Sequence, residues 1–305
     1  MLILFVGPNR IGDAVVACGV LDHLIRTYPD CRITIACGPV AEGVFAAMPH
    51  RERTIVFAKQ RYDLHWLYLW RQVVGIAWDL VVDVRGSGLG YLVWARRRVV
   101  RGRHSGPMFE QHAAMLGVDP APLPVAWTSV ADRDNAAALL PPGRPYVGFG
   151  PTASWPGKAW PGERFAALFG RLAGALPGAM PVIFGGPGAA ERAMAAPALA
   201  ALCGAVDLCG SLSLSQTAAC IQRCGLYVGN DSGLMHLAAA TGVPVVGLCG
   251  TTMGRAAEMA PAGRCAVWAM GDGPSMEALS VETVYATCVQ LLATADCRPD
   301  SETVS

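Results

Sequence analysis

YVGNDSGLMHLAAA, residues 227–240, carries the clearest structural signal in the chain. A short apolar run from Leu226 to Val228 passes through small and polar residues directly into an alanine-rich segment, which is the pattern of a buried strand followed by a helix. The start of such a helix presents backbone N–H groups without helical partners, together with the positive end of the helix dipole. The stretch therefore predicts an anion-binding turn, and a nucleotide diphosphate is the expected anion.

The composition limits the class of protein. The 305 residues suffice for two domains, and with 53% hydrophobic and 15% charged residues they can bury substantial cores. A net charge of +1 gives no general attraction to nucleic acid. No apolar run approaches the roughly 18 residues of a membrane span, and the start of the chain lacks the features of a signal peptide. We therefore expect a cytoplasmic protein with no transmembrane segment and no nucleic-acid partner.

Strand and helix patterns alternate along the whole chain. Helical spacing of apolar residues occurs at 11–28, at 40–48 and in a last segment that Ser280 caps. Short apolar runs separate these segments, and the alternation predicts an α/β fold with parallel sheets covered on both faces. The predicted strands cover residues 2–6, 32–36, 54–57, 80–84, 97–102, 146–149, 181–184, 206–208, 226–228 and 243–248.

The best linker is the proline-rich segment LLPPGRP at 139–145, after which the strand–helix rhythm starts again. We place an N-terminal Rossmann-like domain at 1–142, a C-terminal one at 143–295 and a loose polar tail at 296–305. Two doubly wound domains in tandem would bring the carboxyl ends of both sheets to a shared central cleft. Ligands of such sheets bind beyond those ends.

The first candidate site residue is Asp13, which follows the first strand near the start of a helix. A carboxylate there can take a proton from a substrate hydroxyl. Equally, an acidic residue in a first helical turn is favoured by about 0.3–1 kcal/mol with no catalytic role. The helix dipole and the nearby Arg10 favour the charged form of Asp13 and therefore make it a weaker base. A weak base is sufficient when the reacting carbon becomes cationic before the hydroxyl loses its proton.

The second candidate is the segment 151–161, PTASWPGKAWP, which follows the first strand of the second half. Thr152 and Ser154 can donate to phosphate oxygens, and Lys158 supplies a positive charge. A leaving diphosphate needs that charge when no metal neutralises it. The alternative is a solvated loop with a solvent-facing lysine.

The third candidate is the opening stretch itself. Ser232 can meet a diphosphate or simply cap the helix, as can Asp231. Because a carboxylate would repel the diphosphate, we expect Asp231 to order the loop or to bind a ribose or sugar hydroxyl. His236, one turn further on, can bind the ligand or pack in the core. Glu191, after the glycines of 185–188, can bind a ribose hydroxyl or lie on a solvated helix face.

Several absences narrow the chemistry. The sequence has no G-x-x-x-x-G-K-[ST] segment, which argues against a phosphate-loop ATPase. Its 11 cysteines are scattered without a zinc-binding arrangement. The D-x-D-like piece at 132–134 precedes an alanine-rich helix and is interpreted as a cap. We therefore expect no metal site, with N–H groups and Lys158 neutralising the diphosphate.

Three separated motifs together resemble those of glycosyltransferase family 9, the heptosyltransferases of lipopolysaccharide core. They are IGDAVV at 11–16, KAWPGERF at 158–165 and GNDSGLMHLA at 229–238. The resemblance implies a GT-B fold and an inverting, metal-independent transfer, with no cofactor beyond the donor substrate. It also implies that Asp13 is the base and that Lys158 binds phosphate. The positions that it implies for the donor site are Asp231, Ser232, Gly233 and His236.

The donor that the resemblance implies is ADP-heptose or another nucleotide-diphosphate sugar, and the acceptor is lipopolysaccharide core or a related glycan at the inner membrane surface. Such an enzyme is cytoplasmic or peripheral at the inner face of the inner membrane. Two alternatives stay open: a sugar-nucleotide epimerase of the same architecture, and a non-catalytic protein that binds nucleotide sugar or glycolipid. An arginine cluster can contact an anionic glycolipid or form a surface strand. It comprises Arg96, Arg97, Arg98, Arg101 and Arg103.

Overall fold

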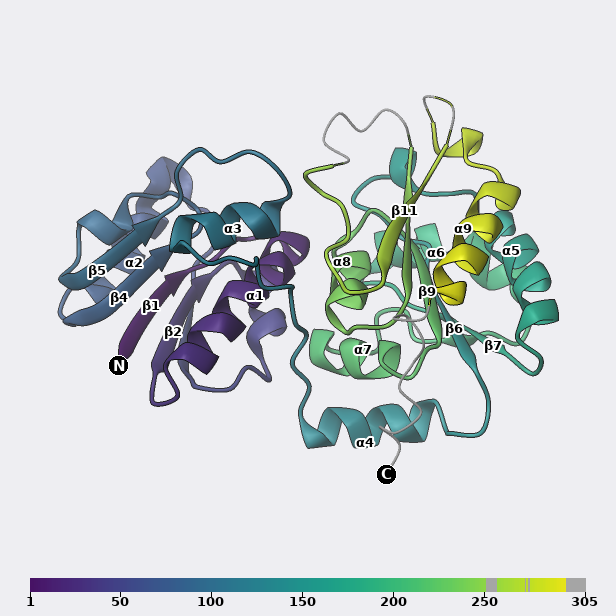
Figure 1. The fold of residues 1–305 in the computed structure, drawn as a ribbon, viewed down its shortest axis with the longest axis horizontal. Coiled ribbons are helices and arrows are strands. Elements are labelled where there is room, and N and C mark those ends of the chain that lie inside the picture. The colour runs from purple at the N-terminus through teal and green to yellow at the C-terminus, as the bar shows by residue number, and fades with distance from the viewer. Residues whose placement is uncertain (251–256, 272, 274, 295–305) are drawn as a thin grey trace. The chain divides into compact units, whose positions relative to one another are not determined.

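The computed structural model describes residues 1–250, 257–271, 273 and 275–294, and divides the chain into two compact units, Met1–Trp127 and Thr128–Ser305 (Figure 1). The division falls at 127/128 rather than at the expected 142/143, because the helix before the proline-rich segment packs against a helix of the second unit. Arg223 also donates from Nε to the carbonyl of Leu140, which ties the end of that helix to the second unit. The expected tail at 296–305 lies outside the described residues.

The first unit contains a five-stranded parallel sheet in the order β3-β2-β1-β4-β5. Its central strand pairs in register from Ile3 to Ile33 on one side and from Ile3 to Leu80 on the other. The central strands are almost wholly buried, as expected for a parallel sheet covered on both faces. The strands are β1 (Leu2–Val6), β2 (Arg32–Cys37), β3 (Arg51–Val56), β4 (Trp78–Asp83) and β5 (Ala95–Val100).

Helices cover both faces of the first sheet. In Figure 1, α1 and α3 lie together on the near face, and α2 lies on the far one. The core under α2 joins Leu69 and Val73 of that helix to Leu4 and Val81 of the sheet and to Val93. The α-helices are α1 (Ile11–Thr27), α2 (Leu64–Val73) and α3 (Met108–Leu116), and the 3₁₀ segments are η1 (Pro39–Phe45), η2 (Arg61–Asp63) and η3 (Leu89–Tyr91).

The second unit contains a six-stranded parallel sheet in the order β11-β10-β9-β6-β7-β8. Numbered within the unit and read from its other edge, this is the 3-2-1-4-5-6 order of the Rossmann fold. The strands are β6 (Tyr146–Gly150), β7 (Met180–Ile183), β8 (Val206–Asp207), β9 (Leu226–Asn230), β10 (Val245–Cys249) and β11 (Ala266–Met270).

Two helical layers enclose this sheet. One contains α5, α6 and α9, whose apolar faces share a core with β6 and β9, and the other contains α7 and α8, with α4 against α7. Ser129 and Asp132 form a capping box at α4, so the 132–134 piece lies inside the first turn of the helix. The helices are α4 (Val130–Leu139), η4 (Pro156–Lys158), α5 (Gly162–Ala175), α6 (Ala189–Ala201), α7 (Leu214–Ile221), α8 (Gly233–Ala240), η5 (Met276–Ala278) and α9 (Val281–Ala293).

Each sheet reverses its strand order at one point, between β1 and β4 in the first unit and between β6 and β9 in the second. In doubly wound folds the loops after the strands diverge at such a point, and ligands bind in the crevice between them. The predicted pair of doubly wound Rossmann-like domains is therefore confirmed. The segment expected as a helix at 40–48 is instead η1, while α2, α3, α7 and β11 were not predicted.

Candidate functional site

The switch point of the second unit brings together two of the predicted motifs. The loop after β6 and the turn after β9 are joined by Asn230, which is fully buried. Its Oδ1 accepts from the backbone N–H of Trp160 at 3.0 Å, and its Nδ2 donates to the carbonyl of Pro151 at 2.7 Å. The asparagine of the opening stretch thus fastens both ends of the 151–160 loop to the end of β9.

The same loop is anchored on its far side. The indole N–H of Trp160 donates to the carbonyl of Leu279 at 2.8 Å, and Nη1 of Arg164 donates to that same carbonyl at 2.7 Å. Trp160 is buried against Phe165 in the core of the unit. The tryptophan and arginine of the KAWPGERF segment therefore fix the backbone from which Lys158 projects.

Lys158 and Asp231 form an ion pair across 73 residues of sequence, with 2.6 Å between Nζ and Oδ2. The aspartate side chain is only 7% exposed and the lysine side chain 27%, so this is not the solvent-facing lysine of the alternative interpretation. An ammonium group has three N–H donors, and one of them is used here. The pair holds the ammonium at the switch point with donors left over for a ligand.

The helix α8 begins beside this pair. Ser232 is its N-cap and accepts from the N–H of Met235 at 3.4 Å, so the capping role is observed. Gly233 opens the helix, and the N–H groups of a first turn lack partners within the helix. His236 is 4% exposed, one turn inside. The dipole end of α8 and the Lys158 ammonium are two positive features at the same strand end.

The remaining predicted contacts of this site differ in exposure. Thr152 is buried at the end of β6, and its Cγ2 lies near Gly185 of the turn after β7. Ser154 is exposed. Glu191 is half-buried and accepts from the N–H of Gly186 at 3.1 Å, which gives it a local role in that turn.

Two glycines of the switch point are required by Tyr227. The ring of this buried tyrosine leans along β9, and a Cβ at Gly229 would lie 2.7 Å from it. A Cβ at Gly150 would lie 2.0 Å from the tyrosine hydroxyl. Real carbon atoms do not approach so closely, so the first glycine of GNDSG serves packing.

Asp13 lies in the first turn of α1, at the carboxyl end of β1 in the first unit. Arg10 is the N-cap residue and makes no side-chain cap. The Asp13 side chain is half-buried, and within the described parts of the chain its carboxylate has no hydrogen bond or ion pair. The carboxylate is therefore available to a ligand of this unit.

Arg85 is a residue at the first unit's switch point that sequence reasoning missed. Its Nη1 donates to Oδ1 of Asn9 at 2.8 Å, which joins the loops after β1 and β4, and its guanidinium lies 4.9 Å from the Trp66 ring centre. Burial lowers the pKa of Arg85. The Asp83 carboxylate accepts from the N–H groups of Arg85 and Gly86, which shapes this turn. The available signal was the sequence DVRG at 83–86, in which polar residues and a glycine follow a buried strand.

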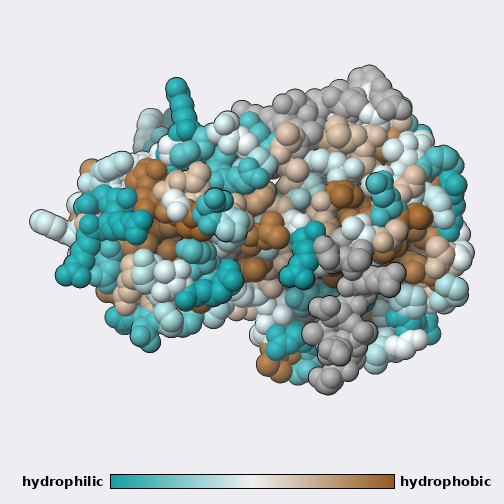
Figure 2. All heavy atoms as spheres, viewed as in Figure 1, coloured by the Kyte–Doolittle hydropathy of each residue, from teal (hydrophilic) through white to brown (hydrophobic). Residues whose placement is uncertain are grey.

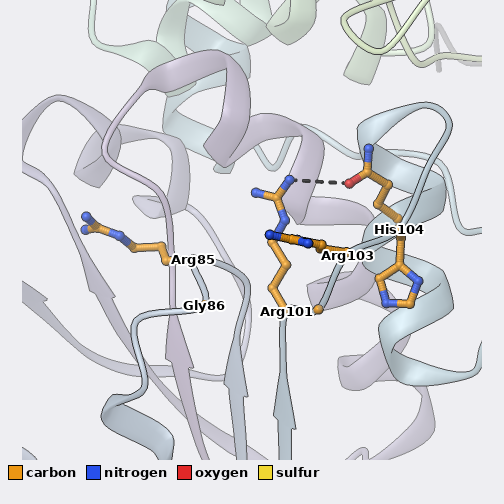
Figure 3. A pocket seen from close by; sticks show the side chains of 7 residues that line it. Arg85, Gly86, Arg101, Arg103 and His104 are labelled. Carbon is orange, nitrogen blue, oxygen red and sulfur yellow. Dashed lines mark hydrogen bonds between the residues drawn. The ribbon is translucent and has the colours of Figure 1, made fainter.

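A cationic pocket of about 440 Å³ opens beyond the end of β5 in the same unit. Arg85, Arg101, Arg103 and His104 are among the residues that line it, and these include no Asp or Glu. Nη2 of Arg101 donates to Oε1 of Gln111 at 3.3 Å. Figure 3 shows the Arg85 side chain pointing away from Arg101 and Arg103, toward the other side of its loop. The pocket therefore offers its charge from the segment 101–104.

The predicted arginine cluster divides into two groups. Arg101 and Arg103 line the pocket, whereas the other three lie on the edge strand β5. Among these, Arg98 donates to the carbonyls of Gly90 and Val93, and Arg96 pairs with Asp79 at 3.6 Å. Only the first group has the geometry of a ligand site.

Metal ligands do not cluster in the described residues, where no group of three or more His, Cys, Asp or Glu side chains could hold an ion. The fold and the β6–β9 switch point, with its Lys158–Asp231 pair, define a two-domain α/β protein of Rossmann type, the architecture of many nucleotide-binding enzymes. The model of "Glycosyltransferase family 9 (heptosyltransferase)" matches residues 97–285. The chain belongs to this family, and it is a glycosyltransferase.

Individual relatives agree with this assignment. The chain is 33% identical to lipopolysaccharide heptosyltransferase 2 of Escherichia coli K12 over 82% of its length and 83% of that protein's. A family 9 glycosyltransferase from Veillonella parvula superposes with a TM-score of 0.80 at 21% identity, covering 95% of this chain and 97% of that one. An E. coli heptosyltransferase solved with ADP superposes with a TM-score of 0.74 at 18% identity, covering 95% and 100%. These likenesses identify the fold as GT-B.

Proposed function

We propose that this glycosyltransferase moves heptose from ADP-heptose to lipopolysaccharide core or a related glycan, with inversion at the anomeric carbon and without a metal. The observation that carries the proposal is the Lys158–Asp231 pair beside the start of α8. Membership of family 9 favours transfer over the epimerase and the non-catalytic alternatives. The choice of ADP-heptose as donor is supported by the relatives, which are heptosyltransferases, and by the ADP bound to one structural neighbour.

On the donor side, the diphosphate of the nucleotide would lie between the Lys158 ammonium and the first N–H groups of α8. Both features carry positive charge before the ligand arrives, so the leaving ADP meets a preorganised environment. Asp231 holds the ammonium in place, and Ser232 and Gly233 present the helix start. Thr152, Ser154 and Glu191 would border the nucleotide, with His236 under the turn.

On the acceptor side, Asp13 would accept the proton of the attacking hydroxyl as the new bond to the anomeric carbon forms and the bond to ADP breaks. A carboxylate suffices because the carbon centre gains oxocarbenium character before the proton leaves. The cationic pocket of Arg101, Arg103 and His104 would bind an anionic group of the acceptor, such as a carboxylate or a phosphate. The reaction would take place at the inner membrane face, where such acceptors are held by their lipid.

The test is a transfer assay with purified protein. ADP-heptose, UDP-sugars and GDP-sugars are each incubated with a deacylated lipopolysaccharide core, with and without a chelator. The proposal expects ADP release and a product heavier by one heptose, with inverted configuration and no loss of rate with chelator. Product formed without an acceptor would identify an epimerase. Donor binding without any turnover would identify a non-catalytic protein.

A further inference from the structure

The outer surface of α2 is apolar where a helix that covers a sheet normally turns polar side chains to water. Leu64, Leu67 and Tyr68 follow helical spacing and are exposed, whereas Leu69 and Val73 of the same helix are buried in the core. A helix of this kind buries one stripe and leaves the opposite one polar. Here the stripe opposite the core is also apolar and faces outward.

A second segment extends this surface. Residues 89–94 cross the same face of the sheet beside α2, where the indole N–H of Trp70 donates to the carbonyl of Leu92 at 2.9 Å. Their outward side chains are large, and Trp94 is 76% exposed. We call the joined surface the α2 face. It comprises Tyr62, Leu64, Leu67, Tyr68, Tyr91, Leu92 and Trp94.

Exposed apolar residues do not by themselves indicate a binding surface, because they are common on proteins. Figure 2 shows hydrophobic residues, in brown, scattered among hydrophilic ones, in teal, in both units. The α2 face differs because its members are ordered by helical spacing and by a hydrogen bond between two segments. It is also rich in tyrosine and tryptophan, whose rings have an apolar body and a polar end. Such side chains collect at the boundary between a membrane and water.

The charges around the α2 face have mostly one sign. Lys59 and Arg61 precede α2, and Arg71 follows Tyr68 on its outer stripe. Arg96 lies on the same side of the sheet, since strand residues alternate and its neighbour Arg98 donates to the carbonyl of Val93.

Acidic groups there are few. Asp63 is exposed, and the one carboxylate beside Arg96 is that of Asp79, which also accepts from the N–H of Leu2. The net charge of the rim is therefore positive. If a second copy docked on this face through a twofold axis, the same cations of the two copies would face and repel one another. A surface of anionic lipids would attract them instead.

We propose that the α2 face docks the protein on an anionic lipid bilayer, with Leu67, Leu92 and Trp94 entering the headgroup region and the cations meeting lipid phosphates. This inference deepens the proposed function, on which it rests for an acceptor held in a membrane. The docking itself needs no reaction. The described residues contain no helix long and apolar enough to cross a bilayer, so lying on the surface is the mode that fits this face.

The experiment is vesicle flotation of the full chain. Vesicles of phosphatidylcholine are compared with vesicles that contain roughly 30% phosphatidylglycerol, at low salt and at about 0.5 M salt. We expect binding to the anionic vesicles, weakened by salt. The variant Leu67→Ser/Trp94→Ser should lower the partition coefficient about tenfold or more, and Arg61→Glu/Arg71→Glu should act similarly. Val40→Ser, an exposed apolar residue of η1, is the matched control and should bind as the parent does.

The readouts separate this inference from the proposed function. Turnover with a deacylated, water-soluble core should be the same for the parent and for both α2-face variants. Equal binding to neutral and anionic vesicles, or equal binding by parent and variants, would overturn the docking surface. A dimer in analytical ultracentrifugation that Leu67→Ser/Trp94→Ser abolishes would assign the face to a second copy instead. Failure of heptose transfer with vesicle binding intact would reject only the proposed function.

Discussion

The Nζ atom of Lys158 lies 2.6 Å from Oδ2 of Asp231 at the point where β6 and β9 run side by side and their following loops diverge. The carboxylate would repel a diphosphate by itself, yet it is buried against the group that attracts one. The Lys158 ammonium neutralises the charge of the Asp231 carboxylate, and the carboxylate in turn fixes the position of the ammonium. This arrangement reconciles an acidic residue with an anion site.

Asp231 is therefore expected to act as a positioning residue. Asp231→Leu removes the carboxylate that holds the Lys158 ammonium in place. Because the ammonium is then no longer oriented toward the diphosphate, kcat should fall about tenfold. Asp231→Asn keeps an oxygen that accepts from Lys158 and removes the repulsive charge, so most of the turnover should return. Steady-state kinetics with a melting curve for each variant measure this. Equal activity in the parent and in the leucine variant would remove Asp231 from the site.

Asp13 is expected to affect chemistry rather than donor binding. Replacing the carboxylate in Asp13→Asn removes the proton acceptor, which should lower kcat by roughly 10²–10⁴-fold. ADP affinity, measured by calorimetry, should stay within about twofold of the parent, since the proposed nucleotide site belongs to the second unit. Asp22→Asn, later on the same helix, is the matched control. Full turnover in Asp13→Asn would show that another group takes the proton.

The packing of Tyr227 against Gly150 predicts that substitutions at these two positions affect stability in different ways. Gly150→Ala drives a methyl group into the tyrosine hydroxyl and should cost about 1–3 kcal/mol in the free energy of unfolding. Tyr227→Phe removes a buried hydroxyl that has no hydrogen-bond partner among the described residues, so it should be neutral or stabilising. In urea titrations the double variant should lose less stability than the sum of the two single changes predicts, because Tyr227→Phe removes the atom that the new methyl group meets. Additive losses would contradict the contact.

His112 predicts a loss of stability in mild acid. Burial and the charge of Arg101 lower the pKa of His112 from 6.5 to about 4. As the pH falls below 6.5 the unfolded chain takes up this proton while the folded chain does not, so folding becomes less favourable. Between pH 7.5 and pH 5 this amounts to about 2 kcal/mol. Urea titrations should give His112→Leu a smaller pH dependence by that amount, and an unchanged dependence would contradict the buried neutral ring.

Much of the fold was predictable because parallel strands that are buried on both faces have short, continuous apolar sequences. Leu2–Val6 and Leu226 to Val228 are examples, and the turn residues after them place the switch points. The helix α2 was missed for a physical reason: with Leu64 and Leu67 outside and Leu69 inside, it lacks the one-sided pattern. The edge strand β11 is as long as β1, but Val267 is its only β-branched residue, so its sequence does not stand out as a strand.

The site was predictable in its parts and not in its pairing. Lys158, Ser232 and Asp231 each follow a predicted strand, so their placement at a sheet end could be expected. That the lysine contacts Asp231 depends on the path of a loop held by Asn230 and Trp160, which local sequence does not specify. The pocket of Arg101 and Arg103 likewise depends on the packing of α3 near β5.

The central claim is that the Lys158 ammonium, held by Asp231, binds the diphosphate of the donor. The most direct test is calorimetric titration of the parent, Lys158→Met and Lys158→Arg with ADP and with adenosine, which lacks phosphate. A charged hydrogen bond of about 1.5–3 kcal/mol predicts that Lys158→Met weakens ADP binding roughly 10–100-fold while leaving adenosine binding unchanged. Unchanged ADP affinity in Lys158→Met, or an equal loss for adenosine, would contradict the account.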